Sequence, residues 1–353
     1  MSSVYLKRKI SPRVVNGHPW IFANEVEKID GEVQGGDIVE LYTHDRKFVG
    51  KGYINPKSQI LVRLLSRSKS DTINEEYFIE RIRQCWEYRK KIGYTENCRL
   101  VFGEADSMPQ LIIDKFNDYF VIQTLALGID AWKPAIVKAL ETIFTPRGIY
   151  ERNDVPVREL EGLAQQKGFL SAPFDTNIII RENGIRFHVD IANGQKTGFF
   201  LDQRDNRQLL SRFVRDKTVL NTFCYTGGFS CYALKAGAQL VHSVDVSAKA
   251  MELTAQNVAL NAPYLGQHEG FTEDVLRYLN QTDRQYEVMI VDPPAYAKSM
   301  DKRHNAVQGY KRLNEAALRK VAPGGILFTF SCSQVVDREL FYHTIAAAAM
   351  EVK

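Results

Sequence analysis

The most constraining feature of this sequence is the alternation of strand-like and helix-like segments that begins near residue 181. Strands are predicted at 217–221, 240–245, 288–292 and 326–331, and helices at 228–235, 248–261, 308–321 and 338–349. When helices connect successive strands, the strands pair in parallel and the helices cover the sheet. Residues 181–353 therefore predict a doubly wound α/β domain.

Two different patterns precede that domain. Residues 1–72 contain predicted strands at 37–42, 48–50 and 59–65 between glycines and polar turns, which is typical of a small β-barrel. Residues 73–180 contain a helix at 75–92, then short strands and a second helix at 129–144 that is stopped by Pro146. This order predicts a central α+β domain.

The composition excludes several classes of protein. Hydrophobic residues make up 44% and charged residues 25% of the chain, which are ordinary globular values. No stretch approaches the roughly 18 apolar residues of a membrane span. The five cysteines are widely spaced and form no C-x-x-C pair, which argues against a disulfide framework or a zinc site and favours the cytoplasm. The oligomeric state is left open, a homodimer included.

Positive charge is concentrated at the amino end. Residues 1–70 contain twelve basic and seven acidic side chains, a net charge of +5, whereas the whole chain carries +4. Four basic residues lie on or beside the last predicted strand of this region: Lys57, Arg63, Arg67 and Lys69. Because neutralising phosphates releases counterions, a basic face of this kind favours contact with RNA.

In a doubly wound sheet, ligands bind beyond the carboxyl ends of the strands. The first strand leads into residues 221–230, where Gly227 precedes the next helix and lets the backbone approach a ligand. Phe223 and Tyr225 stand where a dinucleotide-binding loop needs glycine, so a nicotinamide oxidoreductase is disfavoured.

Two acids follow the next strands. Asp245 ends the strand at 240–245, where a carboxylate can accept both hydroxyls of a ribose. Asp274 ends the segment 270–274, which follows a further strand, and is placed to meet an adenine edge. Each acid alone is more often a cap or a surface residue. Together with the glycine turn, they favour a nucleoside cofactor without a pyrophosphate.

The last two strand ends predict a substrate wall. The strand at 288–292 ends in Asp292, and Pro293 and Pro294 then make the backbone rigid before Tyr296. The strand at 326–331 is followed by Cys332, where a thiolate would reach a substrate bound at the same edge.

The combination of these motifs resembles class I S-adenosylmethionine-dependent methyltransferases, specifically the bacterial 23S ribosomal RNA 5-methylcytosine methyltransferase I group. Further similar stretches cover almost the whole chain, at 18–22, 52–60, 103–106, 149–152 and 196–204. The resemblance implies a PUA RNA-binding domain, a central α+β domain and a Rossmann-like methyltransferase domain that act on 23S rRNA.

The resemblance also implies roles for individual residues. S-adenosylmethionine would be held by Gly227, Asp245 and Asp274, with Thr197 and Gln203 closing over it. Phe223, Tyr225 and Asp292 would line the same site. Cys332 would be the nucleophile, Asp292 would assist at the base, and no metal is implied.

Two departures from the family pattern are visible. Relatives in the broader RNA 5-methylcytosine class often carry a second cysteine in the Asp-Pro-Pro motif, and this chain has none there. Class I sheets usually close with an antiparallel strand pair. Because the chain stops at Lys353, soon after the last predicted helix, we expect those closing strands to be missing.

Three other functions remain as alternatives. A nitrogen or purine methyltransferase needs no nucleophilic cysteine, but such enzymes favour an aromatic residue directly after the two prolines, where this chain has Ala295. A catalytically silent RNA-binding protein would keep only the basic module. The third alternative is a nicotinamide oxidoreductase, which would bind NAD and not S-adenosylmethionine.

Overall fold

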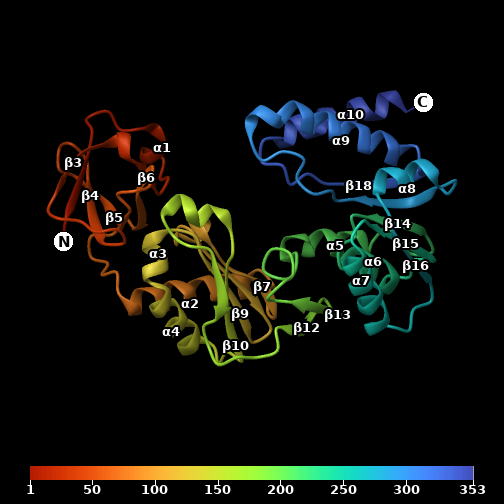
Figure 1. Ribbon diagram of the computed structural model, residues 1–353, viewed down its shortest axis with the longest axis horizontal. Coiled ribbons are helices and arrows are strands. Elements are labelled where there is room, and N and C mark those ends of the chain that lie inside the picture. The colour runs from red at the N-terminus through yellow and green to blue at the C-terminus, as the bar shows by residue number, and fades with distance from the viewer. Residues whose placement is uncertain (353) are drawn as a thin grey trace. The chain divides into compact units, whose positions relative to one another are not determined.

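The computed structural model describes residues 1–352, which form two compact units (Figure 1). The first unit comprises residues 1–180 and 189–201, and the second comprises residues 181–188 and the chain from residue 202 onward. In the described part of the chain, no helix is both long and apolar enough to cross a membrane.

The first unit begins with a six-stranded sheet of order β2-β6-β5-β4-β1-β3. Its elements are β1 (Ser3–Leu6), α1 (Pro12–Val15), β2 (Trp20–Phe22), η1 (Ala23–Glu25), β3 (Val26–Asp30), β4 (Ile38–Tyr42), β5 (Phe48–Ile54) and β6 (Ile60–Ser66). Three of these strands, β4, β5 and β6, are the predicted ones, whereas β1, β2 and β3 were not anticipated. β1 pairs in parallel with β4, and the other neighbours are antiparallel.

The central part of this unit is a five-stranded sheet of order β11-β10-β9-β8-β7, with α2 and α4 packed together over its core. Its elements are α2 (Glu75–Lys91), β7 (Asn97–Phe102), η2 (Gly103–Asp106), β8 (Leu111–Phe116), β9 (Tyr119–Thr124), α3 (Leu127–Ala131), α4 (Lys133–Ile143), β10 (Gly148–Asn153), η3 (Pro156–Glu161) and β11 (Gln166–Phe169). The single helix predicted at 129–144 is therefore two helices. Pro134 lies in the first turn of α4, where its missing N–H costs nothing, and so marks a new helix start.

The two sheets of the first unit are joined by buried contacts. The Tyr53 hydroxyl donates to the carbonyl of Pro109 at 2.9 Å, and a Cβ on Gly128 would stand 2.1 Å from the Tyr53 ring. Trp20 Nε1 donates to Glu104 Oε1 at 2.7 Å. The linker near residue 72 thus separates two sheets that pack as one compact unit.

The second unit contains a five-stranded, wholly parallel sheet of order β16-β15-β14-β17-β18. A hairpin of β12 (Asn177–Glu182) and β13 (Ile185–Asp190), which contributes residues to both units, precedes it. The remaining elements are η4 (Leu201–Gln203), α5 (Arg204–Leu210), β14 (Thr218–Thr222), α6 (Gly228–Lys235), β15 (Leu240–Asp245), α7 (Ala248–Leu260), β16 (Gln267–Thr272), α8 (Val275–Gln281), β17 (Tyr286–Val291), η5 (Met300–Lys302), α9 (Arg303–Leu318), β18 (Val321–Thr329) and α10 (Arg338–Glu351).

Helices cover both faces of this sheet, with α5, α6 and α7 on one face and α8, α9 and α10 on the other (Figure 1). Separate apolar cores lie beneath the two layers, one with Leu210 and Phe229 and the other with Leu279 and Leu313. The predicted doubly wound domain is confirmed. The largest boundary errors concern α9 and β18, which both begin five residues before their predicted starts. The first turn of α9 is polar, and the first half of β18 contains the Pro-Gly-Gly stretch at 323–325.

A chain of polar side chains ties the sheet to α6. Asn221 Nδ2 donates to Ser230 Oγ at 2.8 Å, Ser230 Oγ bonds Ser243 Oγ at 2.7 Å, and Ser243 Oγ lies 2.8 Å from His268 Nε2. Burial lowers the pKa of His268 from its ordinary value of 6.5 to about 4. His268 is therefore neutral in the folded protein at neutral pH.

The free energy of unfolding should consequently fall as the pH drops from 6.5 towards 4, because the unfolded chain binds a proton at His268 before the folded chain does. The expected slope from this residue is up to about 1.4 kcal/mol per pH unit. In urea denaturation across this range, His268→Gln should show a shallower pH dependence than the wild type. An equal slope in both proteins would mean that His268 does not hold its lowered pKa.

Candidate active site

The carboxyl ends of β14, β15, β17 and β18 lie at one edge of the parallel sheet, because adjacent parallel strands run in the same direction. The segments that follow these strands contain most of the predicted site residues. They are the turn at 223–227, Asp245, the segment 292–296 and the segment 331–333.

The turn after β14 has an unusual backbone. Phe223, Tyr225 and Gly227 have positive φ angles of 53°, 51° and 73°. For the two aromatic residues this left-handed conformation costs of order 1–3 kcal/mol each, and such strain concentrates at ligand-binding sites. The sequence predicts these three residues as part of the site but contains no signal for the strain of their backbone.

Side chains from α7 hold this turn in place. Thr254 Oγ1 donates to the carbonyl of Tyr225 at 2.9 Å, and Asn257 Nδ2 donates to the carbonyl of Thr226 at 2.9 Å. Both α7 side chains are completely buried. A Cβ on Gly227 would lie 2.7 Å from Thr254 Cγ2, so the glycine is also needed for the turn to pack on α7.

Asp245 at the end of β15 faces this turn. Its Oδ2 accepts the Tyr225 N–H at 2.9 Å, and its Oδ1 accepts the Ser247 N–H at 2.9 Å. A carboxylate has about four acceptor positions, so each oxygen keeps the capacity to accept a further hydroxyl. The side chain is partly exposed and is suited to hold the two hydroxyls of a ribose.

Asp292 at the end of β17 is oriented by two amides. Gln203 Nε2 donates to Asp292 Oδ2 at 2.8 Å, and Asn206 Nδ2 donates to Gln203 Oε1 at 2.7 Å. Because Asn206 occupies the oxygen of the Gln203 amide, the nitrogen is presented to the carboxylate. Asn206 was not identified from the sequence, which offers no signal that relates it to Asp292.

Cys332 follows β18 and meets the proline segment after β17. Its Sγ lies 3.6 Å from the carbonyl oxygen of Pro293, and its side chain is exposed. The adjacent Ser333 Oγ accepts the backbone N–H groups of Tyr296 and Ala297 at 3.0 and 3.3 Å. The Cys332 thiol therefore lies beside the segment after β17, and the next residue, Ser333, is hydrogen-bonded to that same segment.

The Tyr310 side chain of α9 completes this arrangement. Its hydroxyl lies 2.9 Å from Ser333 Oγ, and its ring packs edge-on against Tyr296, with centroids 4.8 Å apart. Burial raises the pKa of Tyr296 to about 12, so its phenol stays protonated. Ser333 and Tyr310 thus contact the segment after β17, and the sequence predicts no role for either side chain.

The other two cysteines of the second unit lie in a different environment. Cys224 and Cys231 are buried, and this burial raises the pKa of each thiol to about 12. Since the thiolate is the nucleophilic form, neither residue is suited to attack a substrate near neutral pH. The exposed Cys332 is the cysteine of this unit that a substrate can reach.

The remaining predicted residues are found in varied surroundings. Asp274 is exposed and caps α8 by accepting the Arg277 N–H at 2.9 Å. Pro293 is buried and Pro294 is exposed. Thr197 belongs to the first unit, where it is buried and its hydroxyl donates to Asp114 Oδ2 at 2.5 Å.

Of the basic residues predicted to bind RNA, Lys57 and Arg67 are exposed, but Arg63 is not. Its guanidinium forms a two-point ion pair with Glu161, at 3.1 and 2.7 Å, and its side chain is 4% exposed. Arg63 is therefore not part of an exposed basic face, and its contact with RNA stays a prediction. Alternate side chains of a strand with one open face would be expected to face solvent. In β6 they do not, because this strand is buried on both faces.

Within residues 1–352, His, Cys, Asp and Glu side chains form no group of three that could hold a metal ion. The parallel sheet, the strained turn after β14 and the carboxylate after β15 define a Rossmann-like domain that binds a nucleoside cofactor. The exposed thiol beside a proline-rich wall adds a position for a substrate at the same edge.

Comparison with known proteins extends this assignment. A PUA-like domain matches residues 4–67, and the S-adenosylmethionine-dependent methyltransferase family matches residues 165–352. Ribosomal RNA large subunit methyltransferase I of Aliivibrio fischeri (strain MJ11) is 38% identical over 356 residues, which cover 99% of this chain and 90% of the relative. The protein of the same name in Shewanella denitrificans is 40% identical over 345 residues, which cover 95% and 87%.

The chain therefore belongs to the S-adenosylmethionine-dependent methyltransferases, within the family of ribosomal RNA large subunit methyltransferase I. It is an enzyme, and its cofactor is S-adenosylmethionine. A methyltransferase crystal structure in complex with SAH has the same fold, with a TM-score of 0.81 at 23% identity over 99% of this chain and 90% of that one. A methyltransferase from Streptococcus mutans has a TM-score of 0.79 at 23% identity, over 100% and 92% of the two chains.

Proposed function

We propose that this enzyme transfers a methyl group from S-adenosylmethionine to C5 of a cytosine in the 23S ribosomal RNA of the large subunit, through a covalent bond between Cys332 and C6 of that base. The relatives named for large subunit ribosomal RNA support the substrate class. The contact that supports the chemistry is Cys332 Sγ at 3.6 Å from the Pro293 carbonyl, which holds an exposed thiol beside the segment after β17.

The cofactor site is assigned to the edge formed by β14, β15 and β17. Asp245 would accept the ribose hydroxyls, and Asp274 would meet the adenine edge. The turn of Phe223, Tyr225 and Gly227 would lie against the rest of the nucleoside. The described geometry is suited to this group, because both oxygens of Asp245 retain acceptor capacity after binding their backbone N–H groups.

Two further residues, Gln203 and Asp292, are assigned to the border between the cofactor and the target base. Their side chains are hydrogen-bonded to each other. S-adenosylmethionine supplies the methyl group as an electrophilic sulfonium substituent.

The cysteine is needed because C5 of cytosine is a poor nucleophile. The Cys332 thiolate forms a bond to C6, and the electron pair of the C5–C6 double bond attacks the methyl carbon from C5. The methyl–sulfur bond of the donor breaks, a base then removes the C5 proton, and the double bond re-forms as the thiolate leaves. Covalent catalysis of this kind divides one difficult step into several easier ones.

Asp292 would hold the target cytosine by its N3 and N4 edge and assist protonation at N3. Gln203 and Asn206 act through Asp292, because their hydrogen bonds fix the direction of its carboxylate. Pro293, Pro294 and Tyr296 would form the wall against which the unstacked base is held. Unstacking this base costs a few kcal/mol, which contacts in the pocket must offset.

The activity is tested with 23S rRNA from cells that lack this modification. The purified chain should transfer radiolabelled methyl groups from S-adenosylmethionine to this RNA, and mapping should find 5-methylcytosine at one position. N-methylcytosine or a methylated purine as the product would refute the assignment to C5. If neither naked 23S rRNA nor assembled large subunits accept a methyl group, the proposed substrate is refuted.

Asp245→Ala should weaken cofactor binding by about 1.5–3 kcal/mol, the range for hydrogen bonds to a charged group. Isothermal titration calorimetry with S-adenosylhomocysteine measures this loss directly. Because Asp245 also accepts the Tyr225 and Ser247 N–H groups, Asp245→Asn serves as the matched variant that keeps an acceptor in place. Wild-type affinity in a folded Asp245→Ala protein would contradict the ribose assignment.

A further inference from the structure

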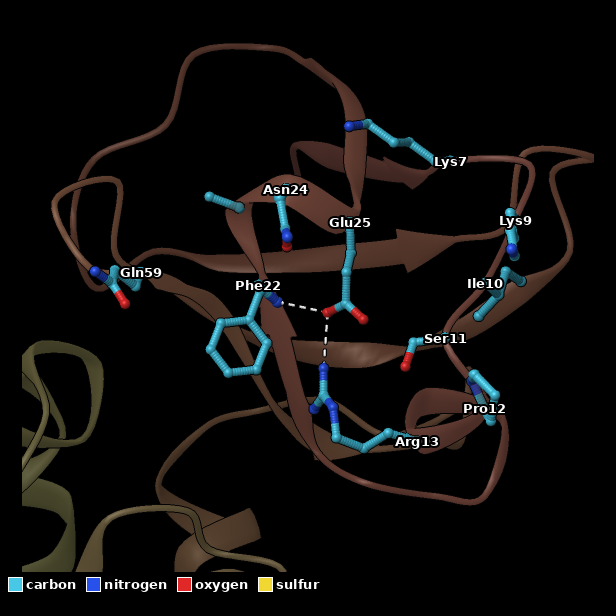
Figure 2. Close-up of a pocket in the computed structure, with 11 residues that line it drawn as sticks. Lys7, Lys9, Ile10, Ser11, Pro12, Arg13, Phe22, Asn24, Glu25 and Gln59 are labelled. Atoms are coloured by element: carbon cyan, nitrogen blue, oxygen red, sulfur yellow. Dashed lines mark hydrogen bonds and ion pairs between the residues drawn. The ribbon is translucent and has the colours of Figure 1, made fainter. Parts of the chain in front are cut away.

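The PUA-like domain contains a cavity of about 750 Å³ that none of the assigned roles uses (Figure 2). It lies between the loop that follows β1, the segment from β2 into η1, and the loop that precedes β6. The residues that line it are Lys7, Lys9, Ile10, Ser11, Pro12, Arg13, Phe22, Ala23, Asn24, Glu25 and Gln59.

One wall of the cavity is a braced aromatic side chain. Glu25 Oε2 accepts the backbone N–H of Phe22 at 2.7 Å and pairs with Arg13 Nη2 at 2.8 Å, as the dashed lines in Figure 2 show. Arg13 Nη1 donates to the Trp20 carbonyl at 2.6 Å, and the guanidinium carbon lies 4.8 Å from the centre of the Phe22 ring. Arg13 is therefore engaged by Glu25 and by the face of the Phe22 ring. The Phe22 ring remains partly exposed.

The rest of the lining combines three chemistries. Lys7 and Lys9 are exposed cations, while Glu25, which is already paired with Arg13, is the acidic residue among the lining side chains. Asn24 and Gln59 bring exposed amides, which can donate and accept hydrogen bonds. An aromatic ring, amides and cations match the three parts of an unstacked nucleotide, which are the flat face of its base, the polar edge of its base and its negative phosphate.

We propose that this cavity binds a single-stranded RNA nucleotide of the substrate, with its base stacked on Phe22, its edge at Asn24 and Gln59, and its phosphates at Lys7 and Lys9. The inference rests on the proposed function, since it takes the substrate to be RNA. It moves the principal RNA contact of this domain away from the strand that the sequence suggested. On that strand Arg63 is buried in an ion pair with Glu161, so its charge is not exposed.

The ionic part of the proposal is tested by equilibrium binding of the full chain to a fluorescein-labelled, mixed-sequence single-stranded RNA. Each phosphate contact contributes a slope of about −0.7 to the dependence of log K on log salt concentration. Lys7→Gln/Lys9→Gln should therefore make this slope shallower by about 1.4. Lys28→Gln/Lys47→Gln, which removes two exposed cations of the same domain outside the cavity, should leave it within experimental error.

The stacking part is tested with Phe22→Leu, which keeps an apolar side chain and removes the ring. Loss of one stacked base should weaken binding by about 5- to 150-fold without changing the salt slope. A 2-aminopurine base in the RNA should be quenched on binding the wild type and much less on binding this variant. Melting curves of both variants should match the wild type, and if Phe22→Leu is unstable, Asn24→Ala replaces it in the affinity measurement.

Two results would overturn the proposal. One is an unchanged salt slope in Lys7→Gln/Lys9→Gln together with a shallower slope in Lys57→Gln/Arg67→Gln, which would return the contact to the strand. The other is wild-type RNA affinity in the folded Phe22 or Asn24 variants, which would leave the cavity to a partner other than RNA.

Methyl transfer to 23S rRNA, measured in parallel, separates this inference from the proposed function. Transfer by the wild type with unaltered RNA binding in all cavity variants refutes the inference alone. RNA binding through the cavity without any methyl transfer refutes the proposed function alone.

Discussion

Cys332→Ser should abolish methyl transfer, with a loss on the order of a thousandfold or more, while leaving the binding of S-adenosylmethionine and of RNA close to wild type. A serine hydroxyl is a far weaker nucleophile than a thiolate near neutral pH, and the substitution changes little in size. Single-turnover methyl transfer measures the loss, and calorimetry and RNA binding measure what is retained.

Covalent catalysis makes a second prediction for the same residue. RNA that contains 5-fluorocytosine at the target has no C5 proton to lose, so the wild-type enzyme should remain bound to it through the Cys332 sulfur. The adduct should be stable in denaturing gels and absent with Cys332→Ser. Cys231→Ala is the matched control, because Cys231 is buried and should leave both the adduct and the activity in place.

An adduct that persists in Cys332→Ser, or full methylation by that variant, would remove the covalent mechanism. Methylation of a base nitrogen would then become the leading alternative, because it needs no nucleophilic cysteine. The mapped product distinguishes the two chemistries independently of the variant.

Arg63→Met should destabilise the first unit by about 3–5 kcal/mol, because it leaves the Glu161 carboxylate buried without its cation. Glu161 also accepts hydrogen bonds from Asn55 and Ser58, so it cannot turn out to solvent without breaking them. Urea denaturation followed by tryptophan fluorescence measures the change, because Trp20, Trp86 and Trp132 all lie in this unit.

A matched double variant separates the charge from the packing. Arg63→Met/Glu161→Gln should recover part of the lost stability, because no buried charge is left without a partner. The salt slope of RNA binding by folded Arg63→Met should equal that of the wild type. Unchanged stability combined with a shallower salt slope would instead return Arg63 to the RNA surface.

The periodicity of the sequence was sufficient to predict the Rossmann-like domain and the sheet edge that carries the candidate site. Strands and helices alternate from β14 to α10, and this pattern requires parallel pairing. Parallel strands bring their carboxyl ends to one edge, so residues such as Asp245, Asp292 and Cys332, far apart in the chain, could be assigned to a common site from their place after a strand.

The helical periodicity was less informative where a helix begins or restarts. The predicted helix at 129–144 is divided at Trp132 because Pro134 begins a new first turn, and the apolar spacing of the two helices is nearly continuous. The spacing of apolar residues indicates which face of a helix is buried. It does not indicate where a helix begins, because that depends on backbone hydrogen bonds, and a proline has no N–H to donate.

What the sequence by itself determined is the class of fold, the edge that holds the site and the residues that follow each strand there, because these depend on local periodicity and chain direction. Only the tertiary structure decided which partner each polar side chain meets. Arg63 pairs with Glu161, and Asn206 orients Gln203 towards Asp292. These pairings depend on how separate elements pack, and a buried charge takes whichever opposite charge that packing brings within reach, so no spacing along the chain encodes them.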